Sequence, residues 1–296
     1  MIMGDILFSI VIPTYNRAAF IGKTINSLLS QTYNNFEIIV VDDGSVDNTS
    51  EVLNGITDSR VAYYKKENGE RGAARNYGAR LAKGSYINFF DSDDLAYPNH
   101  LAEAYKFINA NSRPSFFHLG YDFKSPDGSL IRNVDDLHGD LHAKLIRNNF
   151  LSCNGVFLSK ELSASFPFEE DRTLAVAEDW ALWLRISSRY PILVSNVITS
   201  SVICHDERSI MDYNIEKVVK RDLLLLKVLF NDDQFKAKYK KYLPVFTADR
   251  YTFFSLLLSL KKRKRECVSY LFKAFKAYPL VILERRFWAS VKHMIK

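Results

Sequence analysis

Four short apolar runs, separated by segments of helical spacing, constrain the fold of this chain more than any other feature. They occupy residues 7–13, 36–41, 61–64 and 86–90. A continuous apolar run, rather than an alternating one, is typical of a strand that helices bury on both faces. The strand–helix order therefore predicts an α/β fold in which helices flank a mostly parallel sheet.

The run at 86–90 leads directly into three carboxylates, Asp91, Asp93 and Asp94. Like charges this close do not ionise together at low cost unless a partner compensates them. Mg²⁺ and Mn²⁺ prefer oxygen ligands and commonly share carboxylates with substrate phosphates. The cluster therefore suggests a metal site. The alternative is a solvated Asp-rich turn, because Asp and Ser both favour turns.

Polar residues also end the first two runs. Thr14 and Tyr15 follow the first run, and Asp42 and Asp43 follow the second. The carboxyl ends of parallel strands lie along one edge of a sheet, where open α/β folds bind ligands. We therefore expect these residues to meet the acidic cluster at that edge. Capping of the next helix is the alternative role for the two aspartates.

The segment 68–78 combines three glycines with Arg71 and Arg75 at the start of a predicted helix. Helix N-termini and arginines are natural phosphate partners. The segment contains no GxxxxGKS run, so it is not a P-loop, and the absence of Gly-x-Gly-x-x-Gly after the first run argues against a dinucleotide fold. Charges on a helix surface are the alternative for both arginines.

The composition narrows the class of protein. The 296 residues are 47% hydrophobic and 25% charged, as in an ordinary globular protein of one or two domains. The N-terminus has no basic region typical of a signal peptide, and no apolar run approaches the ~20 residues that span a bilayer. Three cysteines and six scattered histidines suggest neither a disulfide framework nor a zinc site. We therefore expect a cytoplasmic protein.

Beyond residue 94 the pattern is less regular. We expect helices at 98–111 and 174–188, a hairpin-like turn at 125–129, and extended segments at 116–123, 154–158 and 192–203. From residue 215 onward the chain is predicted to be mostly helical, with segments at 218–230, 235–242, 247–260, 266–277 and 283–296.

Five motifs of this chain resemble, in order, those of family 2 glycosyltransferases. They are Ser9–Arg17, Val40–Thr49, Asn68–Gly78, Gly84–Asp94 and Glu178–Trp180. The resemblance extends from residue 9 to about residue 205. It implies the GT-A fold, a nucleotide-sugar donor and transfer of the sugar to an acceptor hydroxyl. Between residues 95 and 175, where acceptor contacts are expected, little matches, which leaves the acceptor undefined.

The resemblance also implies roles for single residues. Those implied in nucleotide binding are Pro13, Thr14, Tyr15, Asp42, Asp43, Arg71, Arg75 and Asp91. The first three would lie along the nucleobase and ribose, and one of the two adjacent aspartates would accept from a base N–H. One of the two arginines would neutralise the phosphates.

Asp91 and Asp93 match the DxD motif of the family, which holds Mn²⁺ or Mg²⁺ against the diphosphate. Asp94 is a possible third metal ligand. His205 is a further candidate, because some family members place a His or Arg over the diphosphate or the metal there. An ordinary structural role is the alternative for His205.

Asp179 matches the catalytic base of the family. A carboxylate that takes the proton of the attacking hydroxyl, opposite the leaving group, predicts a single displacement with inversion. The alternative is a carboxylate at a helix start, favoured by the helix dipole. The two roles are compatible, since a helix start holds the side chain rigidly.

The C-terminal part is strongly basic. Residues 235–296 carry 16 Lys and Arg against three acids, a charge of +13, so the rest of the chain carries −7. Basic residues 261–265 lie between segments that mix aromatic and basic side chains. We consider three interpretations: a helical extension packed on the catalytic domain, a contact with an anionic membrane surface, and a nucleic-acid patch, which the sequence favours least.

The sequence thus predicts a metal-dependent, inverting glycosyltransferase that uses a nucleotide sugar, with a UDP-sugar as the expected donor. The acceptor would be a saccharide or a lipid-linked acceptor in surface-polysaccharide biosynthesis, at the inner face of the membrane. We divide the chain into a catalytic domain at 1–210, with a nucleotide-sugar part at 1–95 and an acceptor part at 96–210, and a helical extension at 211–296. The alternatives are a sugar nucleotidyltransferase and an inactive nucleotide-sugar binding protein.

Overall fold

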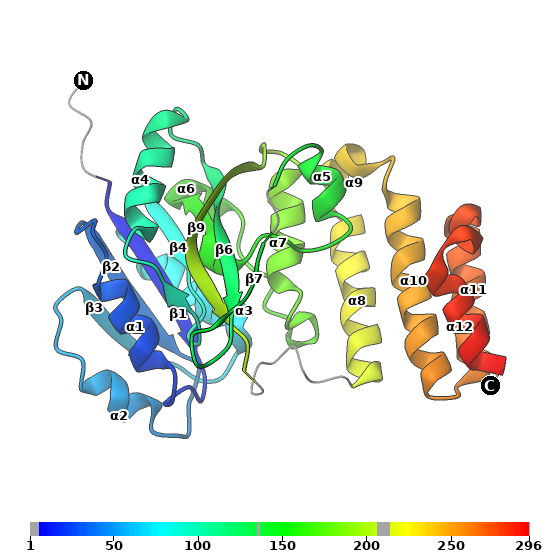
Figure 1. The fold of residues 1–296 in the computed structure, drawn as a ribbon, viewed down its shortest axis with the longest axis horizontal. Coiled ribbons are helices and arrows are strands. Elements are labelled where there is room, and N and C mark those ends of the chain that lie inside the picture. Colours follow the sequence, from blue (N-terminus) through cyan, green and yellow to red (C-terminus); the bar gives the residue numbers. More distant parts are fainter. Residues whose placement is uncertain (1–5, 135–136, 206–213, 296) are drawn as a thin grey trace.

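The computed structural model describes residues 6–134, 137–205 and 214–295. One sheet with helices on both faces forms the N-terminal two thirds of the chain, and a row of helices extends from it toward the C-terminus (Figure 1). The predicted α/β fold with a helical extension is therefore confirmed. The predicted domain boundary at residue 210 falls in 206–213, outside the described residues.

The first half of the sheet is parallel. In spatial order its strands are β3 (Val61–Lys65), β2 (Phe36–Asp42), β1 (Phe8–Thr14) and β4 (Tyr86–Phe89). At the centre, Val11 pairs with Ile39 of β2 on one side and with Phe89 of β4 on the other. Every residue of β1 is buried, as a continuous apolar run predicts for a central strand.

The second half of the sheet is mixed. The order continues with β8 (Val156–Ser159), β6 (Phe116–Lys124), β9 (Leu193–Ile203) and β5 (Leu95–Ala96), and β7 (Leu130–Asn133) lies beside β6. Strand β8 is antiparallel to both β4 and β6, whereas β9 is parallel to β6. The predicted turn at 125–129 joins β6 and β7 as an antiparallel hairpin.

Two apolar cores cover the two faces of the sheet. On one face Ile10 and Ile12 pack with α1 (Ile21–Leu29), α2 (Thr49–Asn54) and α4 (His100–Ala110). On the other face Val11 packs in a core that includes α3 (Glu70–Leu81), α5 (Leu141–Leu145), α6 (Lys160–Ser165) and α7 (Glu178–Ser187). Successive strand residues point to opposite faces, so one short run serves both cores.

The C-terminal part consists of α8 (Ile215–Phe230), α9 (Asp233–Tyr239), α10 (Leu243–Leu260), α11 (Lys264–Ala277), a 3₁₀ segment η4 (Pro279–Leu283) and α12 (Arg285–Ile295). Helix α8 joins the core of α7, and both α11 and α12 pack against α10 (Figure 1). Among the described residues, no helix combines the length and apolar character needed to cross a bilayer.

The starts of two helices shape the region where the strands end. Helix α3 begins at Glu70, within the segment 68–78, and this places Arg71 in its first turn. Helix α7 begins at Glu178 rather than at residue 174, after a 3₁₀ turn, η2 (Arg172–Leu174). The later start has a backbone cause, because Val176 has a φ of 77°, a left-handed conformation that does not continue a right-handed helix.

Candidate active site

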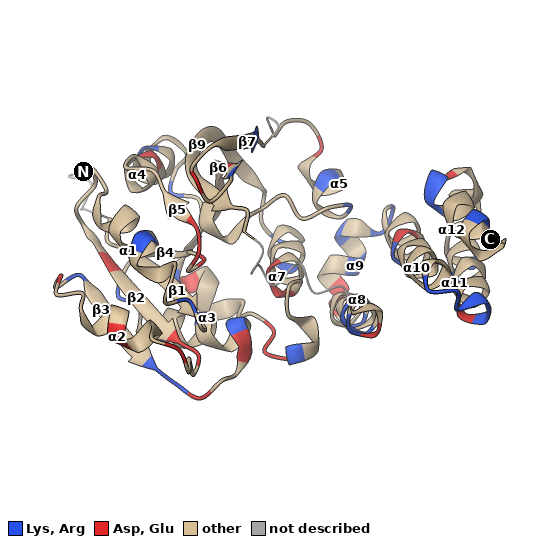
Figure 2. Cartoon of the chain, turned by 60° about the horizontal axis from the view of Figure 1, so that its bottom comes forward, with Lys and Arg blue, Asp and Glu red and all other residues tan. Residues whose placement is uncertain are grey.

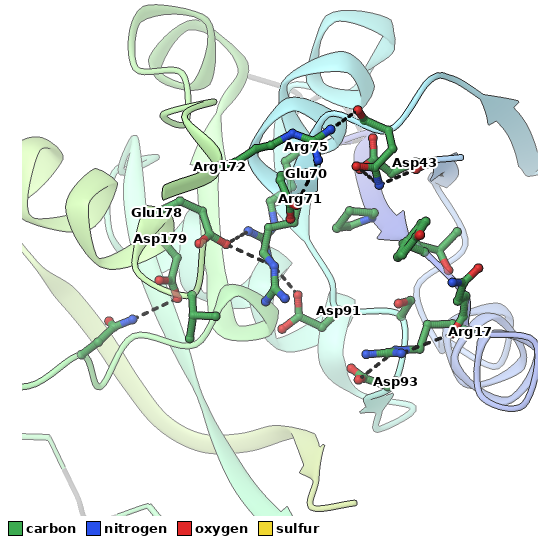
Figure 3. A pocket seen from close by; sticks show the side chains of 18 of the residues that line it. Arg17, Asp43, Glu70, Arg71, Arg75, Asp91, Asp93, Arg172, Glu178 and Asp179 are labelled. Carbon is green, nitrogen blue, oxygen red and sulfur yellow. Dashed lines mark hydrogen bonds and ion pairs between the residues drawn. The ribbon is translucent and has the colours of Figure 1, made fainter. Parts of the chain in front are cut away.

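A pocket of about 770 Å³ opens where β1, β2 and β4 end, between the first turns of α3 and α7 (Figure 3). Of the residues predicted for the site, those that line it are Pro13, Thr14, Tyr15, Asp43, Arg71, Arg75, Asp91, Asp93 and Asp179. Three others, Asp42, Asp94 and His205, are not part of its lining. Most of the predicted site residues thus meet at the edge where the strands end, as expected.

Asp43 and Asp42 take different positions at the end of β2. Asp43 lines the pocket, and its carboxylate accepts hydrogen bonds from the Lys66 ammonium at 2.6 Å and from the Gly69 N–H at 2.9 Å. The buried Asp42 carboxylate instead accepts from the Ser45 N–H at 2.7 Å and the Tyr63 hydroxyl at 2.9 Å. Of the two alternatives, Asp43 is therefore placed to meet a ligand, and Asp42 holds the turn.

The turn after β1 is fixed against the turn after β2. The Asn16 N–H donates to the Ser45 hydroxyl, and the Val46 N–H donates to the Asn16 side chain. Asn16 has a φ of 51°, a left-handed conformation that Asn tolerates. The buried Thr14 hydroxyl has no hydrogen-bond partner among the described residues. The strand end thus presents a polar atom that a ligand can satisfy.

Asp94 does not support its predicted role as a metal ligand. Its side chain is fully buried at 0% exposure, and its carboxylate accepts from the Ile203 N–H at 2.9 Å and the Asn154 amide at 2.7 Å. These bonds join β4 to the end of β9. The correction follows from the turn after β4: Asp91 and Asp93 line the pocket, whereas the bonds from Asn154 and Ile203 hold Asp94 inside the protein.

Asp93 and His205 converge at the pocket edge. The His205 Nε2 atom lies 3.1 Å from the Asp93 carboxylate, and the imidazole stacks on Phe20 with ring centroids 4.3 Å apart. The guanidinium of Arg17 also lies 3.4 Å from Asp93. The side chains that follow His205, up to residue 209, lie outside the described residues.

These donors fit a divalent cation that is shared with a substrate. A carboxylate and an imidazole are suitable ligands for Mn²⁺. No group of three or more His, Cys, Asp or Glu side chains in the described ranges is arranged to hold a metal alone. The Nδ1 atom of His205 is buried without a partner among those residues, so the ring is not fully used by the protein. A cation here would take its remaining ligands from a diphosphate and water.

Arg75 and Arg71 differ in what they contact. Arg75 is only 2% exposed, and its guanidinium donates to Asp91 at 2.8 Å and to Glu178 at 2.7 Å (Figure 3). A buried cation between two carboxylates is already compensated. The Arg71 side chain is more exposed, and its nearest carboxylate contact is 3.8 Å, to Glu178. Arg71 is therefore better placed for a phosphate, whereas Arg75 connects β4 to the start of α7.

Asp179 lies in the first turn of α7, on the opposite wall from Asp43 (Figure 3). Its carboxylate accepts from the Asn149 amide at 2.9 Å and from the Trp180 N–H at 2.6 Å. Burial, and then the neighbouring Glu178, raise its pKa to about 7, although the Arg75 charge acts in the other direction. A carboxyl group with a pKa near neutrality is suited to proton transfer.

Several pocket residues were not assigned from the sequence, namely Asn16, Arg17, Asn68, Glu70, Ser92, Asn148, Asn149, Arg172, Val176 and Glu178. Arg17 and Glu178 belong to recognised motifs, so motif membership could have indicated them. Asn149 and Arg172 belong to the region where no motif matched, and only tertiary contacts reveal them. Arg172 lines the pocket and pairs with Glu70 of α3 at 3.7 Å.

Comparison with known protein sequences gives a consistent result. The family model described as glycosyl transferase family 2 matches residues 9–148. The Escherichia coli protein WfgD, a UDP-Glc:α-D-GlcNAc-diphosphoundecaprenol β-1,3-glucosyltransferase, is 34% identical over 187 residues, which cover 62% of this chain and 71% of WfgD. An uncharacterized glycosyltransferase of Rickettsia bellii is 34% identical over 191 residues, covering 64% of this chain. The chain spans only 27% of that relative's length.

Solved structures share the fold over nearly the whole chain. TarS 1–349 of S. aureus, in complex with UDP-GlcNAc, has a TM-score of 0.70 at 21% identity, with 97% of this chain and 88% of TarS covered. The mannosyltransferase PcManGT of Pyrobaculum calidifontis, in complex with GDP-Man and Mn²⁺, has a TM-score of 0.62 at 16% identity, with 99% and 86% covered. The fold is therefore GT-A, and the sequence relatives carry the assignment further: this chain belongs to family 2 of the glycosyltransferases.

Proposed function

We propose that this chain is a metal-dependent, inverting glycosyltransferase that moves a sugar from a UDP-sugar to a hydroxyl of a saccharide or lipid-linked acceptor in surface-polysaccharide biosynthesis. The observation that carries the proposal is the single pocket in which Asp179 faces the strand-end residues Asp43, Asp91 and Asp93. The names of the relatives agree with it, since WfgD uses UDP-Glc with a diphosphoundecaprenol acceptor and TarS was solved with UDP-GlcNAc.

The nucleoside would occupy the side of the pocket formed by the turns after β1 and β2. Pro13, Thr14 and Tyr15 offer an apolar and hydroxyl-bearing surface for the base and ribose. Asp43 would accept from a base N–H, in the orientation fixed by Lys66. A uracil presents such an N–H, which supports UDP as the nucleotide.

The diphosphate would lie along Arg71, Asp91 and Asp93. Arg71 supplies a cation at the first turn of α3, where backbone N–H groups also favour an anion. Asp93, with His205 and Asp91, would hold Mn²⁺ or Mg²⁺. When bound, the ion neutralises the charge that develops on the departing diphosphate.

Asp179 would act as the base. The acceptor oxygen forms a bond to the anomeric carbon while its proton passes to the Asp179 carboxylate. The bond between that carbon and the diphosphate breaks, and its electron pair leaves with the diphosphate. This single displacement inverts the configuration at the anomeric carbon. The hydrogen bonds from Asn149 and from the Trp180 N–H hold the carboxylate in one orientation for this step.

A donor screen tests the proposal. The chain is incubated with Mn²⁺, a lipid-linked acceptor and each of several UDP-sugars, and both nucleotide release and the anomeric configuration of the product are measured. We expect metal-dependent release of UDP and an inverted linkage. Release of pyrophosphate from a nucleoside triphosphate and a sugar phosphate would instead indicate a sugar nucleotidyltransferase, and nucleotide binding without turnover on any donor would indicate an inactive binding protein.

The variant Asp179→Asn separates binding from chemistry. It keeps the shape and a hydrogen-bond acceptor but cannot take a proton, so transfer is expected to fall about 10²–10⁴-fold. UDP affinity, measured by calorimetry with Mn²⁺, should change little because Asp179 lies on the opposite wall from Asp43. Turnover at the native rate would show that another group is the base.

Two further statements stay predictions. One is a cytoplasmic location, which rests on the few cysteines. The other is the division into a catalytic domain at 1–210 and an extension at 211–296.

A further inference from the structure

Helix α11 has two apolar stripes, and packing accounts for only one of them. The inner stripe, Cys267 and Leu271, is buried in a cluster with α10. The outer stripe consists of Val268, Phe272 and Phe275, whose spacing of i, i+4 and i+7 places them on one side of the helix. All three are exposed, and Phe272 is 67% exposed. The interpretation of a helical extension that simply packs on the catalytic domain does not explain this second stripe.

Exposed apolar side chains also occur on η4 and α12, both of which are in contact with α11. Leu283 is 77% exposed and Trp288 is 58% exposed. The Trp288 indole donates a hydrogen bond to the Ile282 carbonyl at 2.6 Å, which fixes α12 against η4. We call the whole set the C-terminal apolar surface; it comprises Val268, Phe272, Phe275, Leu280, Ile282, Leu283 and Trp288. Exposed apolar side chains gathered in this way mark an interaction site.

The same helices carry many basic side chains. Figure 2 shows Lys and Arg gathered on α11 and α12. The exposed ones include Arg265, Lys273 and Lys276 of α11, and Arg285 and Lys292 of α12. The segment 264–295 contains only two acids, and one of them, Glu266, pairs with Arg263. The partner must therefore be both apolar and negatively charged.

Three kinds of partner can be compared on this chemistry. Nucleic acid would use the positive charge and stack on aromatic rings, but it offers no apolar phase to Val268, Leu280 or Leu283. A second copy would bring the same surplus of cations against this one, and like charges repel. An anionic bilayer accepts both features, because aliphatic and aromatic side chains enter the interface while Lys and Arg remain at the headgroups.

We propose that the C-terminal apolar surface docks this protein on an anionic lipid bilayer. The surface lies at the end of the molecule remote from the nucleotide-binding turns (Figure 1), so docking leaves the pocket open. The proposal stands apart from the proposed function, since it concerns lipid binding and not catalysis. It would nevertheless bring the enzyme to the phase in which a lipid-linked acceptor resides.

Flotation with vesicles tests the docking surface. The full chain is mixed with vesicles of phosphatidylcholine alone, or of phosphatidylcholine with an equal amount of phosphatidylglycerol, and the floating fraction is measured at low and high ionic strength. We expect flotation only with the anionic vesicles and partial release by salt. A chain that stays at the bottom with anionic vesicles at low ionic strength would overturn the proposal.

Two variants locate the contact. Phe272→Ser combined with Leu283→Ser removes two of the most exposed apolar side chains of the surface and leaves the Trp288 hydrogen bond in place, and should lower the floating fraction about fivefold or more. The matched control is Leu130→Ser combined with Ile131→Ser, which changes two exposed apolar residues of β7 and should float like the native chain. Equal flotation of the first variant and the native chain would reject the assigned surface. Self-association in ultracentrifugation or retention of RNA, without flotation, would point to the other partners and also reject it.

Discussion

Asp179 has neighbours with opposite effects on its carboxyl group. Burial and the adjacent Glu178 raise its pKa to about 7, and the Arg75 charge opposes them. Arg75 in turn holds Asp91 and Glu178 by its two terminal nitrogens. The group proposed as the base and a group proposed to contact the donor thus share one buried cation. A substitution at Asp91 or at Glu178 therefore alters the surroundings of the same guanidinium.

The rate of transfer should depend on pH through Asp179. A base works only when deprotonated, so a pKa of about 7 predicts that kcat falls as the pH drops below about 7. Glu178→Gln removes the like charge that raises this pKa, and should move the midpoint lower by about one pH unit. The measurement is the pH profile of kcat at saturating donor.

A matched control is Glu103→Gln, which removes a carboxylate on α4 that pairs with Lys106, outside the pocket. Its profile should coincide with that of the native enzyme. A Glu178→Gln profile that also coincides would contradict the assigned influence of Glu178, and a midpoint at higher pH would reverse its sign. Thermal unfolding of both variants shows whether the fold is retained.

At the scale of elements, the start of α7 depends on an unfavourable backbone conformation. Val176 has a φ of 77°, and a β-branched residue there is a genuine outlier that costs roughly 1–3 kcal/mol. It lies three residues before Asp179 and lines the pocket. Strain of this kind persists where the surroundings fix the backbone, so the segment before α7 is positioned tightly.

Replacing Val176 by Gly tests this strain. Glycine adopts a positive φ freely, so Val176→Gly removes the strain from the folded state. Glycine also increases the entropy of the unfolded chain, which offsets part of this gain, so the free energy of unfolding should rise by up to about 1 kcal/mol. Transfer should fall, because a freer segment holds Asp179 less firmly. Urea unfolding and kcat are the measurements. Val194→Gly is the control, because Val194 pairs regularly with His118 in β9 and is half-buried like Val176; it should lower the stability. A loss of stability in both variants would contradict the argument.

At the scale of the whole molecule, the sheet buries two histidines that the proposed mechanism does not use. Burial lowers the pKa of His100 and of His118 to about 3. Neither ring nitrogen of His118 has a hydrogen-bond partner among the described residues. Both groups are therefore neutral in the folded protein and protonate readily once unfolded, near pH 6.5.

The consequence is a loss of stability in acid. A base whose pKa is lower in the folded state contributes its full stability above the unfolded pKa, and that contribution declines as the pH falls from about 6.5 toward 3. His118→Leu removes one of the two titrations. Relative to the native chain, the variant should gain about 2 kcal/mol between pH 7 and pH 5.

Urea midpoints at the two pH values provide the measurement. His293→Leu on α12 is a control, because that side chain is exposed. A difference between His118→Leu and the native chain that changes with pH no more than that of the control would show that this histidine does not titrate on unfolding.

The sequence by itself determined the elements of the parallel half of the sheet and the edge at which polar residues meet. The spacing of apolar residues is a property of a short stretch of sequence. Runs such as 7–13 and 36–41 therefore specify buried strands without reference to the rest of the chain. The order of strands and helices then places the strand ends together. The motifs at those ends also carried the family assignment, which the comparisons confirm.

Only the tertiary structure decided which of several equivalent residues faces the pocket. Asp42 and Asp43 are adjacent in sequence, yet one bonds to its own turn and the other faces the cavity. Asp94 is excluded by a bond to Ile203, 109 residues away, and Asp179 is oriented by Asn149 from a region without motifs. Such choices depend on contacts between distant segments, which no local pattern encodes, because they exist only once the chain has folded.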